Sequence, residues 1–202
     1  MNILIVSDKE NRTLWKHFDR TQFEGVKMVI SAGDIKQYYL EHLAAMLPVP
    51  LLYVPGNHDT YMAENKPKGC YPVDGKIASV NGIKIAGLGG CQSRNPDGVF
   101  QLSEQQMAAR VKKLMHEAGN HIDIFVSHAP ALGLGDGGDF FHKGFACFHE
   151  ILDDAKPKLH IFGHQHLSYA GKQEYPIQYK DTLLYNAFGH RVIEIDMEGG
   201  QK

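Results

Sequence analysis

The chain alternates between short, continuous apolar runs and longer stretches in which apolar and polar residues mix with helical spacing. Short runs rich in Val, Ile and Leu are typical of strands buried on both faces. Such runs lie at residues 3–6, 26–30, 50–54, 122–126 and 159–162. The helix-like stretches between them are residues 11–20, 35–46, 103–118 and 144–154. Alternating strands and helices predict an α/β fold whose neighbouring strands are parallel.

Local patterns add detail to these elements. Ser103 and Gln106 have the spacing of a capping box at the start of the third helix. Asn81-Gly82 between apolar flanks predicts a two-residue β-hairpin, and the segments TLLYNAF and RVIEI add strands near the end. We therefore expect mixed sheets in two packed layers. Stretches rich in Gly, Pro and Asp are expected to be long loops that border a site: residues 61–76, 87–102 and 129–143.

Composition narrows the classes of protein that fit. A chain of 202 residues with 43% hydrophobic content suits one domain spanning 1–202. Its 21 basic and 23 acidic residues nearly cancel, which gives no electrostatic argument for a nucleic-acid or membrane partner. No basic region followed by a long apolar stretch opens the chain, so we expect a cytoplasmic protein without an anchor. Three cysteines without a CxxC pair argue against disulfides or a thiolate zinc site.

Each of the apolar runs is followed at once by a residue of a metal-binding type. In chain order these residues are Asp8, Asp34, Asn57, His128 and His164. Any one of them alone is better explained as a helix cap or a polar turn. Because the carboxyl ends of strands in an open α/β sheet border one crevice, the whole series predicts a common site.

The residue types indicate the chemistry of this site. Carboxylate, amide and imidazole ligands without thiolate suit Mn, Fe or Zn better than Ca. On an extended backbone His164 and His166 lie on the same side, so they could serve two cations roughly 3.5 to 4 Å apart. Such a pair of cations needs a bridging carboxylate, and Asp34 is the natural choice.

In order, the segments that carry this pattern are Asp8, "GD" at 33–34, "GNHD" at 56–59, His128 and "GHQH" at 163–166. They resemble the calcineurin-like metallophosphoesterase superfamily, whose signature runs DxH, GD, GNH followed by an acid, a lone His and GHxH. The resemblance covers nearly the whole chain. It implies an αββα sandwich of two mixed β-sheets flanked by helices, two divalent metal ions, and hydrolysis of a phosphoester by a metal-bridging hydroxide.

The resemblance also assigns roles to individual residues. The first metal would be held by Asp8, Asp34 and His166. The second metal would be held by Asp34, Asn57, His128 and His164. His58 would protonate the leaving oxygen, and Asp59 beside it would orient and charge the imidazole. We expect two divalent metal ions, with Mn as the first choice and Fe, Zn or Ni as alternatives.

The sequence departs from the family pattern at one ligand position. The DxH motif is replaced by Asp8-Lys9-Glu10, so the usual histidine is absent. Glu10 either binds the first metal with an oxygen, or forms a capping box with Ser7 at the start of the next helix. Residue patterns favour neither alternative. Either way, the first metal site should be weaker or differently selective.

The substrate class follows less directly. The Arg that phosphoprotein phosphatases carry after the GD aspartate is missing from "GDIKQYY". The segment "PKLHIFGHQH" with a later "YNAFG" is more similar to the small phosphodiesterase branch, including its members that hydrolyse cyclic nucleotides. We therefore expect a phosphodiesterase with a small phosphoester substrate. The alternatives are a phosphomonoesterase of the same fold and a metal-binding scaffold with weakened catalysis. The oligomeric state cannot be read from the sequence.

Two further features have open interpretations. The Gly-rich segment 133–145 is either a flexible loop or a rim on which Asp136, Asp139 or His142 meets substrate. Arg94 is either a phosphate clamp or a solvated surface residue. The histidines that fall in expected helices or strands are interpreted as structural: His17, His42, His116, His149 and His160.

Overall fold

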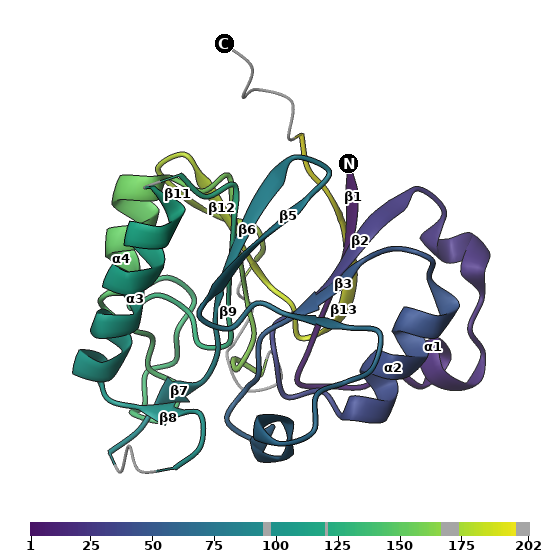
Figure 1. Ribbon diagram of the computed structural model, residues 1–202, viewed down its shortest axis with the longest axis horizontal. Coiled ribbons are helices and arrows are strands. Elements are labelled where there is room, and N and C mark those ends of the chain that lie inside the picture. Colours follow the sequence, from purple (N-terminus) through teal and green to yellow (C-terminus); the bar gives the residue numbers. More distant parts are fainter. Residues whose placement is uncertain (95–97, 120, 167–173, 197–202) are drawn as a thin grey trace.

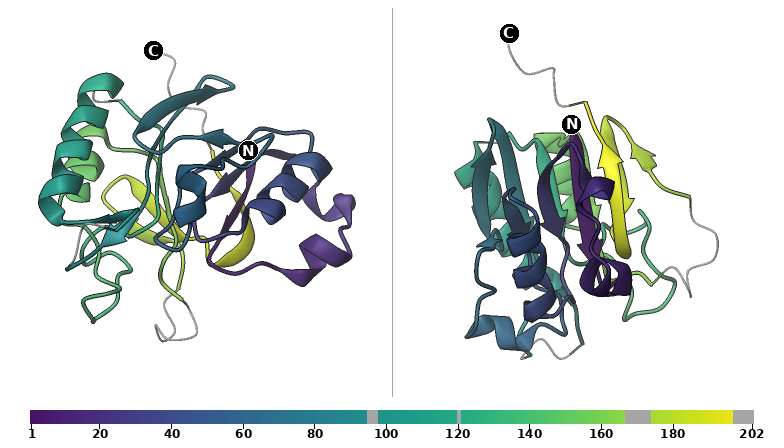
Figure 2. Two further views of the ribbon diagram at one scale, coloured as in Figure 1. Left: turned by 60° about the horizontal axis from the view of Figure 1, so that its bottom comes forward. Right: turned by 90° about the vertical axis from the view of Figure 1, so that its right-hand side faces the viewer.

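The computed structural model describes residues 1–94, 98–119, 121–166 and 174–196, which form two main sheets packed between helices (Figure 1). The first sheet contains, in spatial order, β13 (Gly189–Glu194), β1 (Asn2–Ser7), β2 (Val26–Ser31), β3 (Leu51–Tyr53) and β4 (Tyr71–Pro72). Strands β1 to β4 are parallel, and β13 runs antiparallel beside β1 (Figure 2).

The second sheet is also mixed. It contains, in spatial order, β11 (Ile177–Tyr179), β12 (Thr182–Asn186), β10 (Leu159–Phe162), β9 (Ile124–Ser127), β6 (Ile83–Leu88) and β5 (Lys76–Val80). The four central strands are parallel, and each outer strand is antiparallel to its neighbour. The β5–β6 hairpin turns at Asn81 and Gly82, both with positive φ, which confirms the hairpin expected from the sequence.

Side-chain alternation along the buried strands explains why their sequences are apolar throughout. In β1, Ile3 and Ile5 belong to the core between the two sheets, whereas Leu4 and Val6 belong to the core under the helices. The helices on that side are α1 (Arg12–Lys16) and α2 (Gln37–Met46). Those covering the second sheet are α3 (Glu104–Ala118), the short α4 (Phe148–Glu150) and the π-helical turn η3 (Ile151–Ala155). The expected αββα sandwich is confirmed.

Helix ends follow the capping residues more closely than the apolar pattern. Helix α3 begins at the expected capping box of Ser103 and Gln106, and ends at Gly119. The helix expected over 11–20 stops at Lys16, and a separate 3-10 turn, η1 (Arg20–Phe23), begins after Asp19. The Asp19 side chain accepts a hydrogen bond from the Thr21 backbone N–H, a local contact that favours a new helix start over continuation.

The stretches expected to be long loops contain short elements. Residues 61–76 include β4 and most of the 3-10 turn η2 (Thr60–Ala63). Residues 87–102 include β7 (Cys91–Gln92) and β8 (Gln101–Leu102), while residues 95–97 of this stretch lie outside the described part of the chain. Residues 129–143 form only isolated bridges. Within the described residues, no helix combines the length and hydropathy required to span a bilayer.

Candidate metal centre

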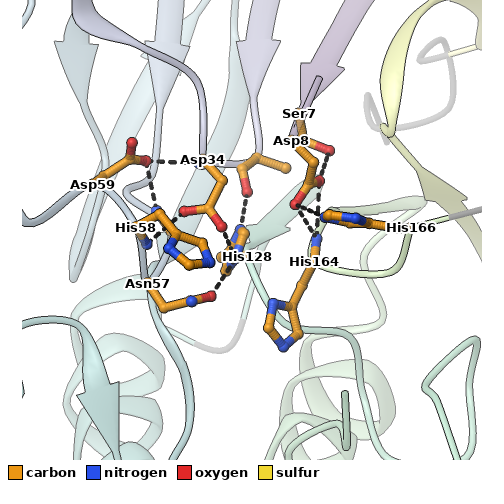
Figure 3. Close-up of polar contacts among 12 residues, drawn as sticks. Ser7, Asp8, Asp34, Asn57, His58, Asp59, His128, His164 and His166 are labelled. Atoms are coloured by element: carbon orange, nitrogen blue, oxygen red, sulfur yellow. Dashed lines mark hydrogen bonds and ion pairs between the residues drawn. The ribbon is translucent and has the colours of Figure 1, made fainter. Parts of the chain in front are cut away.

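The polar residues that follow the parallel strands meet at one end of the sandwich (Figure 3). Asp8, Asp34 and Asn57 come from the first sheet, and His128, His164 and His166 from the second. Contacts across the two sheets bring them together. His128 Nε2 lies 3.3 Å from Asp34 Oδ2, and the His164 backbone N–H donates to the Asp8 carboxylate at 3.0 Å.

Three of these residues form a cluster with metal-binding geometry. Asp34, His128 and His164 each offer a ligand atom, and the three atoms lie within 4.8 Å of one another. Asn57 joins this cluster, because its Oδ1 is 3.1 Å from His128 Nε2. The cluster therefore contains all four residues expected to hold the second metal.

Backbone carbonyls fix which imidazole nitrogen can act as a ligand. His128 Nδ1 lies 2.7 Å from the carbonyl oxygen of Ala32, and His164 Nε2 lies 2.7 Å from that of Phe141. A carbonyl only accepts, so each of these nitrogens carries an N–H, and in the neutral ring the opposite nitrogen has the lone pair. Histidine ligands are commonly oriented in this way by groups behind them. His128 Nε2 and His164 Nδ1 are thus the nitrogens available to a cation.

The pKa shifts of Asp34 and His128 indicate that the cluster favours a positive charge beside the Asp34 carboxylate. Burial alone would lower the pKa of His128, but the Asp34 carboxylate raises it to about 9. Burial would likewise raise the pKa of Asp34, yet His128 and the His58 backbone N–H lower it to about 2. A proton on His128 Nε2 thus stands between two acceptors, Asp34 Oδ2 and Asn57 Oδ1. A divalent cation fits the same set of oxygen and nitrogen donors.

Gly56 and Gly163 allow the backbone to pass close to the side chains of the site. A Cβ on Gly56 would lie 2.1 Å from Asp34 Oδ1 and 2.6 Å from His128 Cε1. A Cβ on Gly163 would lie 2.8 Å from Asp8 Oδ2. The glycines of "GNHD" and "GHQH" are therefore required by the packing of the site itself.

The backbone turns sharply at the ends of the strands that carry the site. Asp8, Asp34 and His164 have φ values of 60°, 54° and 66°, in the left-handed region that is uncommon for residues other than glycine. Strain of this kind is typical of functional sites. It also corrects one expectation: the chain is not extended at His164, so His164 and His166 do not project from one face of a strand. They diverge, as Figure 3 shows.

Asp8 and His166 form a second group beside the cluster. The Asp8 side chain is 1% exposed and accepts from the Ser7 hydroxyl, while His166 Nε2 lies 3.6 Å from Asp8 Oδ1. The His166 side chain is 42% exposed and its ring packs 5.1 Å from that of Phe188. Two residues expected at the first metal thus adjoin each other, next to the set expected at the second.

His58 and Asp59 do not form the expected pair. His58 is exposed, and its backbone N–H donates to Asp34 Oδ1 at 2.8 Å. Asp59 is buried, and its Oδ2 accepts from the backbone N–H groups of Gly56 and Asp34 at 2.9 and 2.7 Å. No hydrogen bond joins its carboxylate to the His58 ring within the described residues. The Asp59 carboxylate instead joins the loop that carries Asn57 to the loop that carries Asp34.

Of the two interpretations of Glu10, the structure contradicts the capping box, and the role as a ligand of the first metal stays a prediction. The cap of α1 is Asn11, whose side chain accepts from the Thr13 backbone N–H, so the capping box is wrong. Glu10 Oε2 instead accepts from the Tyr38 hydroxyl at 2.9 Å. It is not part of the cluster formed by Asp34, His128 and His164.

Some contributors were not identified from the sequence. Ser7, which donates to Asp8, carries a weak signal because it directly precedes the first acid. The carbonyls of Ala32 and Phe141 carry none, because every residue has a carbonyl. The acids of the 133–145 segment are occupied within it: Asp136 accepts from Gly133 and Gly144, and Asp139 from Phe141 and His142.

Comparison with known protein families gives a match over most of the chain. The family model described as calcineurin-like phosphoesterase matches residues 1–168. No curated protein has a significantly similar sequence.

Among solved structures, one crystal structure superposes with a TM-score of 0.67 at 14% identity, covering 95% of this chain and 94% of its own. The protein TT1561 of Thermus thermophilus superposes with a TM-score of 0.63 at 15% identity, covering 93% of this chain and 89% of its own. Identities this low show a shared fold alone. An archaeal phosphodiesterase superposes less well, with a TM-score of 0.47 at 14% identity, covering 94% of this chain and 84% of its own.

Proposed function

The chain belongs to the calcineurin-like phosphoesterase family, and from that membership we propose that it is a phosphodiesterase acting on small phosphoesters with two divalent cations. Membership makes it a metal-dependent phosphoesterase, which is a hydrolase. The preference for diesters, the number and identity of the cations, and the residue roles are the parts that we propose.

One observation carries the proposal: Asp34, His128 and His164 converge within 4.8 Å although they follow three different strands of two sheets. Asp34, Asn57, His128 and His164 would hold one cation, and Asp8, Asp34 and His166 the other. Bound there, the cations supply a water nucleophile ionised near neutral pH and neutralise charge on the phosphoryl oxygens.

The surroundings of His58 support a role in the departure of the leaving group. Its backbone is fastened to Asp34 by the 2.8 Å hydrogen bond, so its ring lies at the edge of the cluster (Figure 3). The ring is exposed, which leaves it able to meet a substrate and to exchange protons with water. We assign it the transfer of a proton to the departing alkoxide, a role suited to imidazole near neutral pH.

The proposal is tested by incubating the purified protein with Mn²⁺ and a chromogenic phosphodiester, beside the matching monoester. We expect release that depends on the metal and is faster with the diester. Asp34→Asn should abolish both release and most metal binding, because the variant loses the carboxylate shared by both cations. Asp181→Asn, at an exposed position, is the matched control. Faster release from the monoester would contradict the diester preference, and no release from either would contradict the function.

The role of His58 is tested by His58→Ala. For diesters with poorly stabilised leaving groups we expect hydrolysis to slow by about 10²- to 10⁴-fold, the usual contribution of general acid catalysis. With p-nitrophenolate, which needs no proton to depart, the loss should be much smaller. Metal affinity should stay the same, since His58 is outside the ligand set, and His116→Ala serves as a control on the exposed face of α3. Equal losses for both leaving groups would refute the acid role.

A further inference from the structure

The segment from Asp136 to His142 is attached directly to the candidate metal centre. The Phe141 carbonyl accepts from His164 Nε2 at 2.7 Å. The next carbonyl along the chain, that of His142, accepts from Gln165 Nε2 at 2.5 Å. Gln165 is 2% exposed and lies between His164 and His166 in sequence. The segment is therefore held against the same residues that carry the proposed ligands.

Internal hydrogen bonds give the segment a defined shape. Asp139 Oδ1 accepts from the backbone N–H groups of Phe141 and His142 at 2.8 and 3.1 Å, and its Oδ2 lies 2.7 Å from His142 Nδ1. The Asp136 carboxylate accepts from the backbone N–H groups of Gly133 and Gly144 at 2.9 and 3.1 Å, which joins the two ends of the segment. Both carboxylates therefore hydrogen-bond within the segment, and we do not assign either of them to substrate binding.

The side chain that this segment does offer is Phe141. It is 70% exposed, the most exposed large apolar side chain in the described part of the chain. Its backbone N–H and carbonyl are both hydrogen-bonded, to Asp139 and His164, which holds the Phe141 backbone beside the candidate metal centre. Aromatic side chains are common among the residues that line small-molecule sites.

The surroundings of Phe141 favour a flat partner. The Phe140 ring lies edge-on to Phe141 with centroids 6.1 Å apart, and Arg94 places its guanidinium carbon 4.5 Å from the Phe140 centroid. Arg94 is exposed and brings a positive charge to this rim. Aromatic faces and a guanidinium plane both stack well on planar rings, and a cation suits an anionic ester.

We propose that Phe141 is a specificity-determining residue on which a planar aromatic substituent of the phosphoester stacks while its phosphoryl group occupies the metal centre. This inference rests on the proposed function and adds the substrate class: esters that carry an aromatic ring. Phe141 contributes no chemistry to the reaction. The backbone that carries it is already held by hydrogen bonds before substrate arrives, which lowers the entropic cost of binding.

The test uses phosphonates, whose C–P bond is not hydrolysed and whose phosphoryl oxygens can occupy the metal centre. Calorimetry on the Mn²⁺-loaded protein compares phenylphosphonate, cyclohexylphosphonate and methylphosphonate. We expect phenylphosphonate to bind about ten-fold more tightly than methylphosphonate, within the range measured for stacking on aromatic side chains. In Phe141→Ala this ratio should fall to about one, and Phe141→Tyr should restore it. Tyr71→Ala, which removes a ring that is 62% exposed on β4, should keep the ratio of the unaltered protein.

Other outcomes overturn the inference. Equal binding of phenyl and methyl compounds, or a ratio that survives Phe141→Ala, would show that nothing stacks there. Cyclohexylphosphonate binding as tightly as the phenyl compound would indicate selection for apolar bulk rather than for a planar ring. Hydrolysis of the chromogenic diester by the same preparations reports on the proposed function separately, because the phosphonate ratio requires binding but no turnover.

Discussion

At the scale of single residues, His160 shows how a polar side chain can be structural. It is fully buried in β10, stacked 4.7 Å from the Phe125 ring. The Ser127 hydroxyl donates to the Ala129 carbonyl, so the His160 Nε2–H donates to Ser127 Oγ at 2.8 Å. Its Nδ1 has no hydrogen-bond partner within the described residues. The sequence-based assignment of His160 to the structure rather than the site agrees with this packing.

This environment leads to an expected pH dependence. Burial lowers the pKa of His160 to about 3, whereas a histidine in the unfolded chain titrates near 6.5. Between these values the unfolded state binds one more proton, so folding stability falls as the pH is lowered through this window. From pH 7 to pH 5 the part of this loss that is due to His160 should be about 2 kcal/mol.

Denaturant unfolding in the presence of a chelator measures this loss without interference from metal ions. His160→Phe keeps an aromatic ring in the core and cannot be protonated, so its stability should fall by about 2 kcal/mol less over the same pH interval. The comparison concerns the slope with pH, so any constant packing cost of the larger ring cancels. Parallel pH profiles for the variant and the unaltered protein would show that His160 does not titrate as expected.

Glu10 is a second residue for which the structure leads to a clear expectation. Its carboxylate accepts from the Tyr38 hydroxyl, a role that a neutral amide can also fill. Glu10→Gln should therefore change Mn²⁺ affinity by less than about two-fold. Asp8→Asn, as the matched control, should weaken the affinity by about ten-fold or more. Mutating a residue that only orients a ligand typically weakens metal binding this much, and losing the ligand itself should weaken it at least as much.

Calorimetric Mn²⁺ titration of both variants distinguishes the alternatives. If Glu10→Gln weakened binding as much as Asp8→Asn, Glu10 would be a ligand after all, and its contact with Tyr38 would be broken when metal binds.

At the scale of elements, predictability follows the range of the interactions that define each element. Apolar runs such as 3–6 and 159–162 identified strands to within about two residues, because burial on both faces imposes a continuous pattern. The hairpin at Asn81-Gly82 and the capping box at Ser103 were also correct, since each depends on neighbouring residues alone. The order of strands along the chain then placed the candidate ligands at one end of the molecule.

The expectations that were wrong depend on local competition or on tertiary contacts. The spacing of Ser7 and Glu10 matched a capping box, but Ser7 remains in β1 and Asn11 caps the helix. The "GHQH" segment was expected to be extended, but His164 turns into the left-handed region where its N–H can reach Asp8. That contact spans 156 residues, and no local pattern encodes it.

At the scale of the whole molecule, the candidate site lies on the seam between the two sheets. Asp8, Asp34 and Asn57 are presented by one sheet, and His128, His164 and His166 by the other. The buried pair of Asp34 and His128 joins the sheets at 3.3 Å, with burial opposing the charged form of each partner. A cation at this position would bind residues of both layers at once, and the unfolded chain does not assemble such a site.

Metal binding should therefore stabilise the fold as a whole. Mn²⁺ at about one hundred times its dissociation constant should add about 2.7 kcal/mol to the free energy of unfolding. For a chain of this size that corresponds to a rise in Tm of about 5 to 10 °C relative to the protein with chelator. Thermal unfolding followed by circular dichroism measures the shift. Asp34→Asn should remove it, since this residue is expected to contact both cations, whereas Asp181→Asn should preserve it. A shift that survives Asp34→Asn would mean that the stabilising metal binds elsewhere, and the seam would then owe its stability to the packing of the sheets alone.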